Sequence, residues 1–143
     1  MRGVRAGRAN WAPRLTLAWA GAMFVFAIVP THVLLRASVG ERETSATQIG
    51  HFIEFAVLAG LATWWMAGRR DDRAARAPIS SAAAVWVAAV CYGALIELVQ
   101  APLPYRSAQL SDLVIDAAGA LAGLLTIRCV RTLRERRARW RVR

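Results

Sequence analysis

The sequence predicts an all-α integral membrane bundle of four transmembrane helices, with both the N and C termini in the cytoplasm. Of its 143 residues, 57% are hydrophobic and 20% are charged, whereas soluble domains are closer to half apolar and a quarter charged. Four segments each supply the roughly 20 apolar residues that a helix needs to cross a bilayer. The charges gather between and beyond those segments. This pattern excludes a disordered chain and a disulfide-rich secreted module.

The four predicted spans cover residues 15–35, 50–68, 79–101 and 112–130. Pro30 and His32, near the end of the first span, predict a kink or an early exit from the membrane. The connections 36–49, 69–78 and 102–111 are short and polar, as expected for loops. A basic cytoplasmic tail, 131–143, follows the last span. Residues 1–143 are therefore predicted to form a single membrane domain.

The distribution of arginine predicts the orientation. The net charge is +10, and all 19 basic residues are Arg. Sixteen of them lie before the first span, in the loop after the second, or at the C-terminal end. Cytoplasmic loops hold the excess of basic residues, so these segments are predicted to be cytoplasmic. We expect the basic ends to attract anionic lipid head groups and not to bind nucleic acid, because the tail has no interleaved aromatic residue beyond Trp140 and no folded reading element.

Cysteine supports neither a disulfide nor a zinc site. The predicted topology puts Cys91 midway along the third span and Cys129 near the cytoplasmic end of the fourth. Because these positions lie at different depths, we expect two reduced residues that serve in packing.

Polar residues within the apolar runs predict a functional site. A charged group at the centre of a span costs about 2.5–3.5 kcal/mol on insertion scales, so such groups are expected to face a bundle interior, a watery cavity or a partner. The alternating direction of the spans brings them to one layer near the extracytoplasmic surface. The members of this layer are His51, Glu54, Glu97, Gln100, Asp112 and Asp116, with Arg106 in the adjoining loop.

Helical spacing gives these residues a common inward direction. Asp112 and Asp116 share a face with Gly119 and Gly123, and small residues four apart allow helices to approach closely in lipid. Gly93 suggests a similar approach one turn before Glu97. The stripe on the fourth span is therefore predicted to face another helix.

Structural roles remain open for several of these residues. Asp112 follows Ser111 at a helix start, where it would satisfy free N–H groups. His51 lies near an interface, where it could simply hydrogen-bond a carbonyl, and Arg106 could only neutralise carboxylates. Glu97 lies in an apolar run where no capping role is expected.

The segments HFIEFAVLAG (51–60) and YGALIELVQAPLPYRSAQLSDLVIDAAGALAG (92–123) resemble the VanZ-like family of small bacterial membrane proteins. The matching features are a His-Phe pair, Glu-Leu-x-Gln, a loop with Pro and Arg-Ser, an Asp that opens the last span, and Gly-x-x-x-Gly. They fall on His51–Phe52, Glu97–Gln100, Pro104, Arg106–Ser107, Asp112 and Gly119–Gly123. The sequence departs from the family pattern at Asp116, where Asn is usual, at Phe55, where Tyr is common, and just before His51, where an Asp or Lys is common.

The resemblance implies a multi-pass protein of the bacterial cell membrane, in a family whose founding member is linked to low-level teicoplanin resistance. We therefore expect a site at the outer leaflet that binds or processes an envelope lipid or a cell-wall precursor. The catalytic candidates are His51, Glu97, Asp112 and Asp116, and the binding candidates are Glu54, Gln100, Arg106 and Ser107.

Several functional alternatives stay open at this point. Arg106 would anchor a phosphate or carboxylate, and His51 would act as general acid or base. Glu97 and Asp116 would position a water or a divalent cation such as Mg²⁺, Mn²⁺ or Zn²⁺, although no compact ligand motif requires a metal. An enzyme and a passive binder fit equally well. The alternative class is a membrane scaffold or assembly factor. A small transporter is less favoured, because the acids lie on one side of the membrane. Cofactor, ligand and oligomeric state are not predicted.

Overall fold

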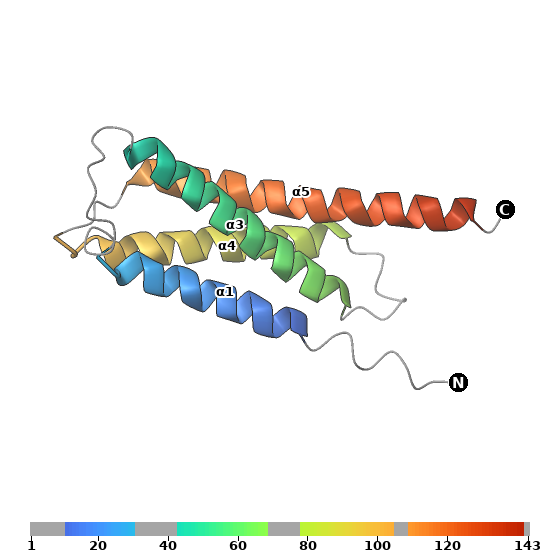
Figure 1. The fold of residues 1–143 in the computed structure, drawn as a ribbon, viewed down its shortest axis with the longest axis horizontal. Helices are drawn as coiled ribbons and strands as arrows, with labels where there is room; N and C mark the ends of the chain where they lie inside the picture. Colours follow the sequence, from blue (N-terminus) through green and yellow to red (C-terminus); the bar gives the residue numbers. More distant parts are fainter. Residues whose placement is uncertain (1–10, 31–42, 69–77, 105–108, 142–143) are drawn as a thin grey trace.

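A computed structural model describes residues 11–30, 43–68, 78–104 and 109–141, and every regular element in these ranges is an α-helix. The helices are α1 (Trp11–Ile28), α3 (Glu43–Gly68), α4 (Pro78–Gln100) and α5 (Leu110–Trp140). They lie side by side as an elongated bundle (Figure 1). The all-α class predicted from the apolar runs is confirmed.

All four helices are long and apolar enough to cross a membrane. The candidate spans are Trp11–Ile28, Thr47–Ala67, Ser81–Gln100 and the helix Leu110–Trp140. Only about a quarter of the most apolar stretch of each candidate span is buried inside the bundle. The large apolar surface that remains has no counterpart in a soluble fold of this size, and a bilayer accounts for it. The chain is therefore a multi-pass membrane protein, as predicted.

The first two helices differ from their predicted bounds. α1 begins at Trp11, four residues before the predicted span, and ends at Ile28. Pro30 follows two residues later, so the helix ends before the proline, and the remainder of the predicted span (31–35) lies outside the described residues. α3 begins at Glu43, so residues 43–49 are helical and not part of a loop. The prediction was too short because an apolar run indicates only the part of a helix expected in the lipid. It gives no sign of polar first turns that precede that part.

α5 extends well beyond the predicted span 112–130. It is one continuous helix of 31 residues, which corresponds to a length of about 46 Å. The hydrocarbon core of a bilayer is about 30 Å thick. The basic segment thus continues the span as helix as far as Trp140, since Arg, Leu, Glu and Ala favour helix and neither Gly nor Pro interrupts them.

The bundle depends on a close contact between α3 and α5. A Cβ atom at Gly119 would overlap the backbone of Phe52, and one at Gly123 would overlap the backbone of Ala56. The two helix backbones therefore touch at both glycines, and the prediction that this stripe faces another helix is confirmed. Small residues here let the dispersion contacts between two backbones replace contacts with lipid.

Helix α1 is attached through side chains that donate to backbone carbonyls. Its Trp19 indole N–H donates to the carbonyl of Glu54 on α3 at 3.0 Å. From α4, the Tyr92 hydroxyl donates to the carbonyl of Ala20 at 2.5 Å. Inside a bilayer no water competes for these groups, so the bonds fix how α1 lies against its neighbours.

The arrangement gives the bundle two distinct ends. α1 begins and α5 ends at one of them, while α4 ends and α3 and α5 begin at the other (Figure 1). A chain that crosses the membrane an even number of times has its two termini on the same side, and four spans agree with this arrangement. The end that faces the cytoplasm is still a prediction from the distribution of arginine. Most of the arginine residues lie outside the described ranges.

We predict that Gly123→Ala destabilises the bundle, whereas Gly21→Ala does not. The new methyl group at position 123 would overlap the Ala56 backbone, while nothing lies within 4 Å of a Cβ at Gly21. Overpacking a well-packed contact typically costs about 1–3 kcal/mol. Thermal unfolding of the purified chain in detergent, followed by circular dichroism, measures the difference. Equal melting temperatures for the two variants would contradict the α3–α5 contact described here.

Candidate functional site

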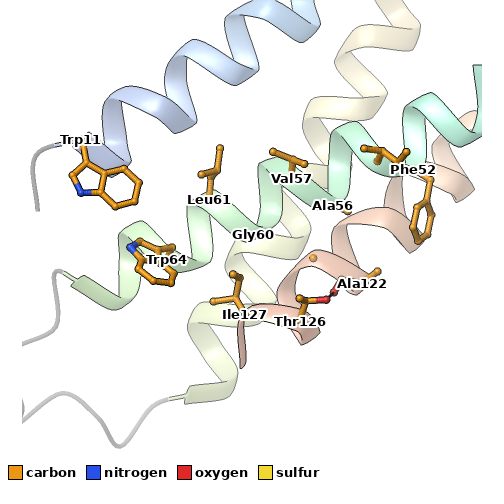
Figure 2. Close-up of a pocket in the computed structure, with 12 residues that line it drawn as sticks. Trp11, Phe52, Ala56, Val57, Gly60, Leu61, Trp64, Ala122, Thr126 and Ile127 are labelled. Atoms are coloured by element: carbon orange, nitrogen blue, oxygen red, sulfur yellow. Dashed lines mark hydrogen bonds between the residues drawn. The ribbon is translucent and has the colours of Figure 1, made fainter. Parts of the chain in front are cut away.

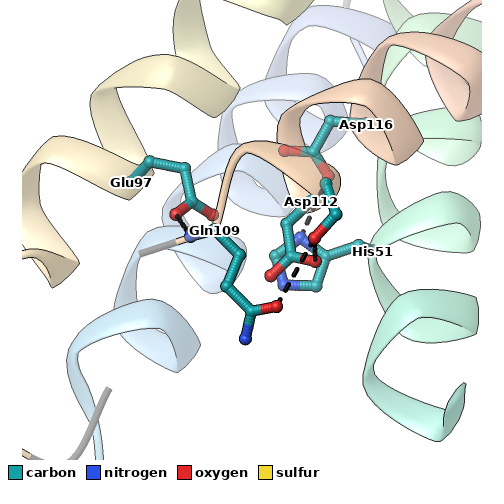
Figure 3. A network of polar contacts seen from close by, with 6 residues as sticks. His51, Glu97, Gln109, Asp112 and Asp116 are labelled. Atoms are coloured by element: carbon teal, nitrogen blue, oxygen red, sulfur yellow. Dashed lines mark hydrogen bonds and ion pairs between the residues drawn. The ribbon is translucent and has the colours of Figure 1, made fainter. Parts of the chain in front are cut away.

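Four of the predicted residues lie together at the end of the bundle where α3 and α5 begin. We call His51, Glu97, Asp112 and Asp116 the polar layer. Figure 3 shows them facing one another from α3, α4 and α5. Residues from three helices do lie near one another, as expected, whereas their depth in the membrane and their functional roles remain predictions.

The central contact of the polar layer joins His51 and Asp116. The Nδ1 atom of His51 lies 3.0 Å from Oδ1 of Asp116, with side-chain exposures of 15% and 0%. A carboxylate only accepts hydrogen bonds, so the imidazole donates from Nδ1. Nε2 of a neutral ring is then left as an acceptor. The buried acid thus orients an imidazole that is still partly accessible.

The second oxygen of Asp116 has no hydrogen-bond partner among the described residues. This buried atom, Oδ2, lies over α4, where a Cβ at Gly93 would come within 2.7 Å of it. Gly93 therefore makes room for the acid, in agreement with the close approach predicted at that position. An unsatisfied buried polar atom costs about 1–3 kcal/mol, so this arrangement lowers the stability of the bundle.

Glu97 links the end of α4 to the beginning of α5. Its Oε2 accepts the backbone N–H of Gln109 at 2.9 Å, and Gln109 is the N-cap residue of α5. The same N–H is bound by a Glu three residues into the helix in a capping box. Here a neighbouring helix supplies the carboxylate, so the expectation that Glu97 has no capping role was wrong. Its other oxygen, Oε1, is buried and without a partner in the described part of the chain.

Asp112 occupies the first turn of α5. It is 8% exposed, and its Oδ1 lies 3.4 Å from the Ser111 hydroxyl. An acid in the first turn complements the helix dipole, so the structural role considered for this residue fits its position. It also brings a third acidic side chain into the polar layer.

The binding candidates are less concentrated. Gln100 is buried and donates from Nε2 to the carbonyl of Ala27 at 3.1 Å, so it fastens α4 to α1. Glu54 lies one turn after His51, and its backbone carbonyl accepts the Trp19 bond. Arg106 and Ser107 lie outside the described residues. No group of three or more His, Cys, Asp or Glu residues in the described ranges is arranged to hold a metal ion.

Sequence reasoning missed the part played by Gln109 and did not identify what Gly93 contacts. Gln109 contributes a backbone N–H, a group that every non-proline residue carries, so no residue pattern could single it out. Gly93 was recognised as a small residue, although its contact with Asp116 depends on how α4 and α5 are rotated. Both contributions arise from tertiary structure.

We predict that Glu97→Gln retains the cap of α5 and that Glu97→Ala loses it. The glutamine side chain keeps an oxygen that can accept the Gln109 N–H, while alanine has none. Loss of an N-terminal cap costs about 0.5–2 kcal/mol. Hydrogen exchange of the amides in the first turn of α5 should therefore accelerate in Glu97→Ala and stay near wild type in Glu97→Gln. Equal acceleration in both variants would contradict the bond.

Comparison with known proteins gives one informative match. Searches of curated proteins and of solved structures found no match to the chain. The family model described as VanZ/LLP1 matches residues 8–131. That range includes all four helices apart from the last turns of α5, and it contains every residue of the polar layer. The chain belongs to the VanZ/LLP1 family.

Proposed function

We propose that the polar layer is a site at the outer leaflet of the bacterial cell membrane, where it binds or processes an envelope lipid or a cell-wall precursor. The observation that carries this proposal is the His51–Asp116 pair, held at 3.0 Å by two different helices. A fully buried acid that orients a partly exposed imidazole is the arrangement by which proteins prepare a general base or acid.

Unsatisfied oxygens support a site that acts on a polar ligand. Oε1 of Glu97 and Oδ2 of Asp116 are both buried and unpartnered within the described structure. Groups of this kind reduce stability, and proteins tolerate such costs mainly at functional sites. A hydroxyl, an amine or a bound water of an incoming head group would provide the missing hydrogen bonds.

The loop between α4 and α5 supports recognition of an anion. Its described ends, Pro104 after α4 and Gln109 before α5, lie at the end of the bundle that carries the polar layer. We assign Arg106, together with Ser107, the role of anchoring the phosphate or carboxylate of the ligand, because a planar guanidinium binds such groups through two parallel hydrogen bonds. His51 would then move a proton at the anchored group, with Asp112 and Asp116 as neighbouring acids. Whether the ligand is converted or only held is decided by experiment.

A specific observation also favours the alternative, a scaffold or assembly factor without chemistry. Glu97 caps α5 and the His51–Asp116 pair joins α3 to α5, so both contacts hold the bundle together. If they serve only that purpose, variants that preserve folding will preserve function. The two classes therefore differ in how Glu97→Gln behaves, because this change is expected to spare the cap.

The test is mass spectrometry of envelope lipids and cell-wall precursors from matched bacterial strains. One strain lacks the gene, and the others are restored with wild type, Glu97→Gln, His51→Gln or Leu98→Ala at equal abundance. Leu98 neighbours Glu97 but is 71% exposed on the lipid-facing side, so its variant controls for general disturbance of α4. We expect wild type and Leu98→Ala to change one lipid or precursor relative to the deletion strain.

In the same comparison, Glu97→Gln and His51→Gln should lose most of that change. A loss of about tenfold corresponds to one charge-assisted hydrogen bond of about 1.4 kcal/mol. If both variants match wild type while remaining folded, the polar layer is structural and the scaffold interpretation replaces this proposal.

A further inference from the structure

A long apolar groove runs between α3 and α5, separate from the polar layer. It has a volume of about 510 Å³. Figure 2 shows side chains of α3 and α5 on its two sides, with Phe52 at one end and Trp11 and Trp64 at the other. Phe52 and Trp64 are twelve residues apart on α3, which corresponds to about 18 Å along the helix. The groove therefore has the length and the apolar lining that suit an extended hydrocarbon chain.

The tryptophan end of the groove adjoins a basic pocket. Trp64 lines both the groove and a second pocket of about 370 Å³, whose other lining residues are Ala67, Arg131, Arg134 and Glu135. The guanidinium carbon of Arg134 lies 5.7 Å from the centre of the Trp64 ring. An apolar trough thus passes directly into a cationic pocket through one shared aromatic side chain.

The charge of the basic pocket favours an anion. Arg131 and Arg134 lie one turn apart on α5, and among the described residues neither forms an ion pair with a carboxylate. Glu135 is the one acidic residue among the described residues that line the pocket, so these described residues carry a net positive charge. The fork of an Arg side chain matches the oxygens of a phosphate.

The depth of these groups in the membrane matches the parts of a phospholipid. Trp64 is near the end of the candidate span Thr47–Ala67, the position where Trp commonly marks the boundary between lipid and head groups. A helix crosses the hydrocarbon core in about 20 residues, so on α5, which begins at Leu110, we expect Arg131 and Arg134 to lie beyond the hydrocarbon. The groove lies at the depth of acyl chains, and the basic pocket lies at the depth of phosphates.

We propose that the groove and the basic pocket together bind one anionic phospholipid from the leaflet at the end of the bundle where α5 terminates. One acyl chain lies along α3 and α5, and the lipid phosphate binds Arg131 and Arg134. The predicted orientation makes this the cytoplasmic leaflet. The basic pocket is at the opposite end of the bundle from the polar layer, and no residue of the polar layer lines the groove or the pocket, so the site does not depend on the function proposed above.

A phospholipid fits better than a free phosphate or a neutral lipid. Free phosphate would leave the groove unused, and a net neutral head group would gain less from two arginines that form no ion pair with a carboxylate of the described residues. The general attraction of basic residues to an anionic surface contributes about the same binding free energy for every Arg near the membrane. A specific site therefore has a distinctive signature, since it depends on which arginines are removed and not on how many.

The test compares two double variants with the same change in net charge. Native mass spectrometry of the full chain released from detergent measures retention of phosphatidylglycerol and of phosphatidylcholine at equal concentration. We expect wild type to retain phosphatidylglycerol in preference, and Arg131→Gln/Arg134→Gln to weaken that retention by about tenfold, as expected for the loss of a charge-assisted contact. Arg136→Gln/Arg139→Gln, on the same exposed helix end, should weaken it by less than about twofold.

A second pair of variants tests the groove. Val57→Phe places a ring in the groove beside Gly60, while Val87→Phe adds the same bulk at an exposed position on α4 that does not line it. We expect only Val57→Phe to reduce phosphatidylglycerol retention. Three outcomes would overturn the proposal: equal loss in both arginine pairs, equal retention of the two lipids by wild type, or displacement of the lipid by inorganic phosphate with no effect of Val57→Phe.

Discussion

The contact between the backbones of α3 and α5 is the constraint on which the other features depend. Gly119 lies against Phe52, which is the residue after His51. On its own helix, Gly119 comes one turn after Asp116. Fixing this pair of positions also fixes the separation of the imidazole and the carboxylate. Four residues further along, Gly123 lies against Ala56 and lines the floor of the apolar groove. One contact thus sets the geometry of the polar layer and of the adjoining part of the groove.

The same contact explains how a charged layer is tolerated within a membrane protein. An acid in lipid is costly, but Asp116 is enclosed by α3 and α4 and accepts a bond from His51. Removing one member of a buried pair is more damaging than the pair is stabilising, because the remaining group is left without a partner. The polar layer therefore fixes how α3 and α5 align with each other, and it adds little to the stability of the bundle.

Much of the fold could be predicted from the sequence because a bilayer imposes simple rules. Apolar length located all four spans, and their alternating direction placed His51, Glu97 and the two aspartates at one depth. The Gly119–Gly123 stripe identified the face of α5 that meets another helix. Hydropathy could not locate the first turns of α3 or the helical continuation of α5, because both segments are polar. The bond from Gln109 to Glu97 was equally invisible, since it depends on where a loop returns to α4. The assignment of Arg106 and Ser107 rests on the sequence alone, as both lie outside the described residues.

The bonds that attach α1 have a consequence for how the sequence can change over evolutionary time. Trp19, Tyr92 and Gln100 each donate to a backbone carbonyl, of Glu54, Ala20 and Ala27 respectively. Every residue type offers a backbone carbonyl, so the acceptor positions can drift to other residues of suitable size without losing the attachment. The three donors have no such freedom, because each bond needs a side chain of that reach with a polar hydrogen. Sequence divergence along α1, α3 and α4 should therefore be uneven: the few donor positions on α1 and α4 should stay fixed, while the acceptor positions are free to vary.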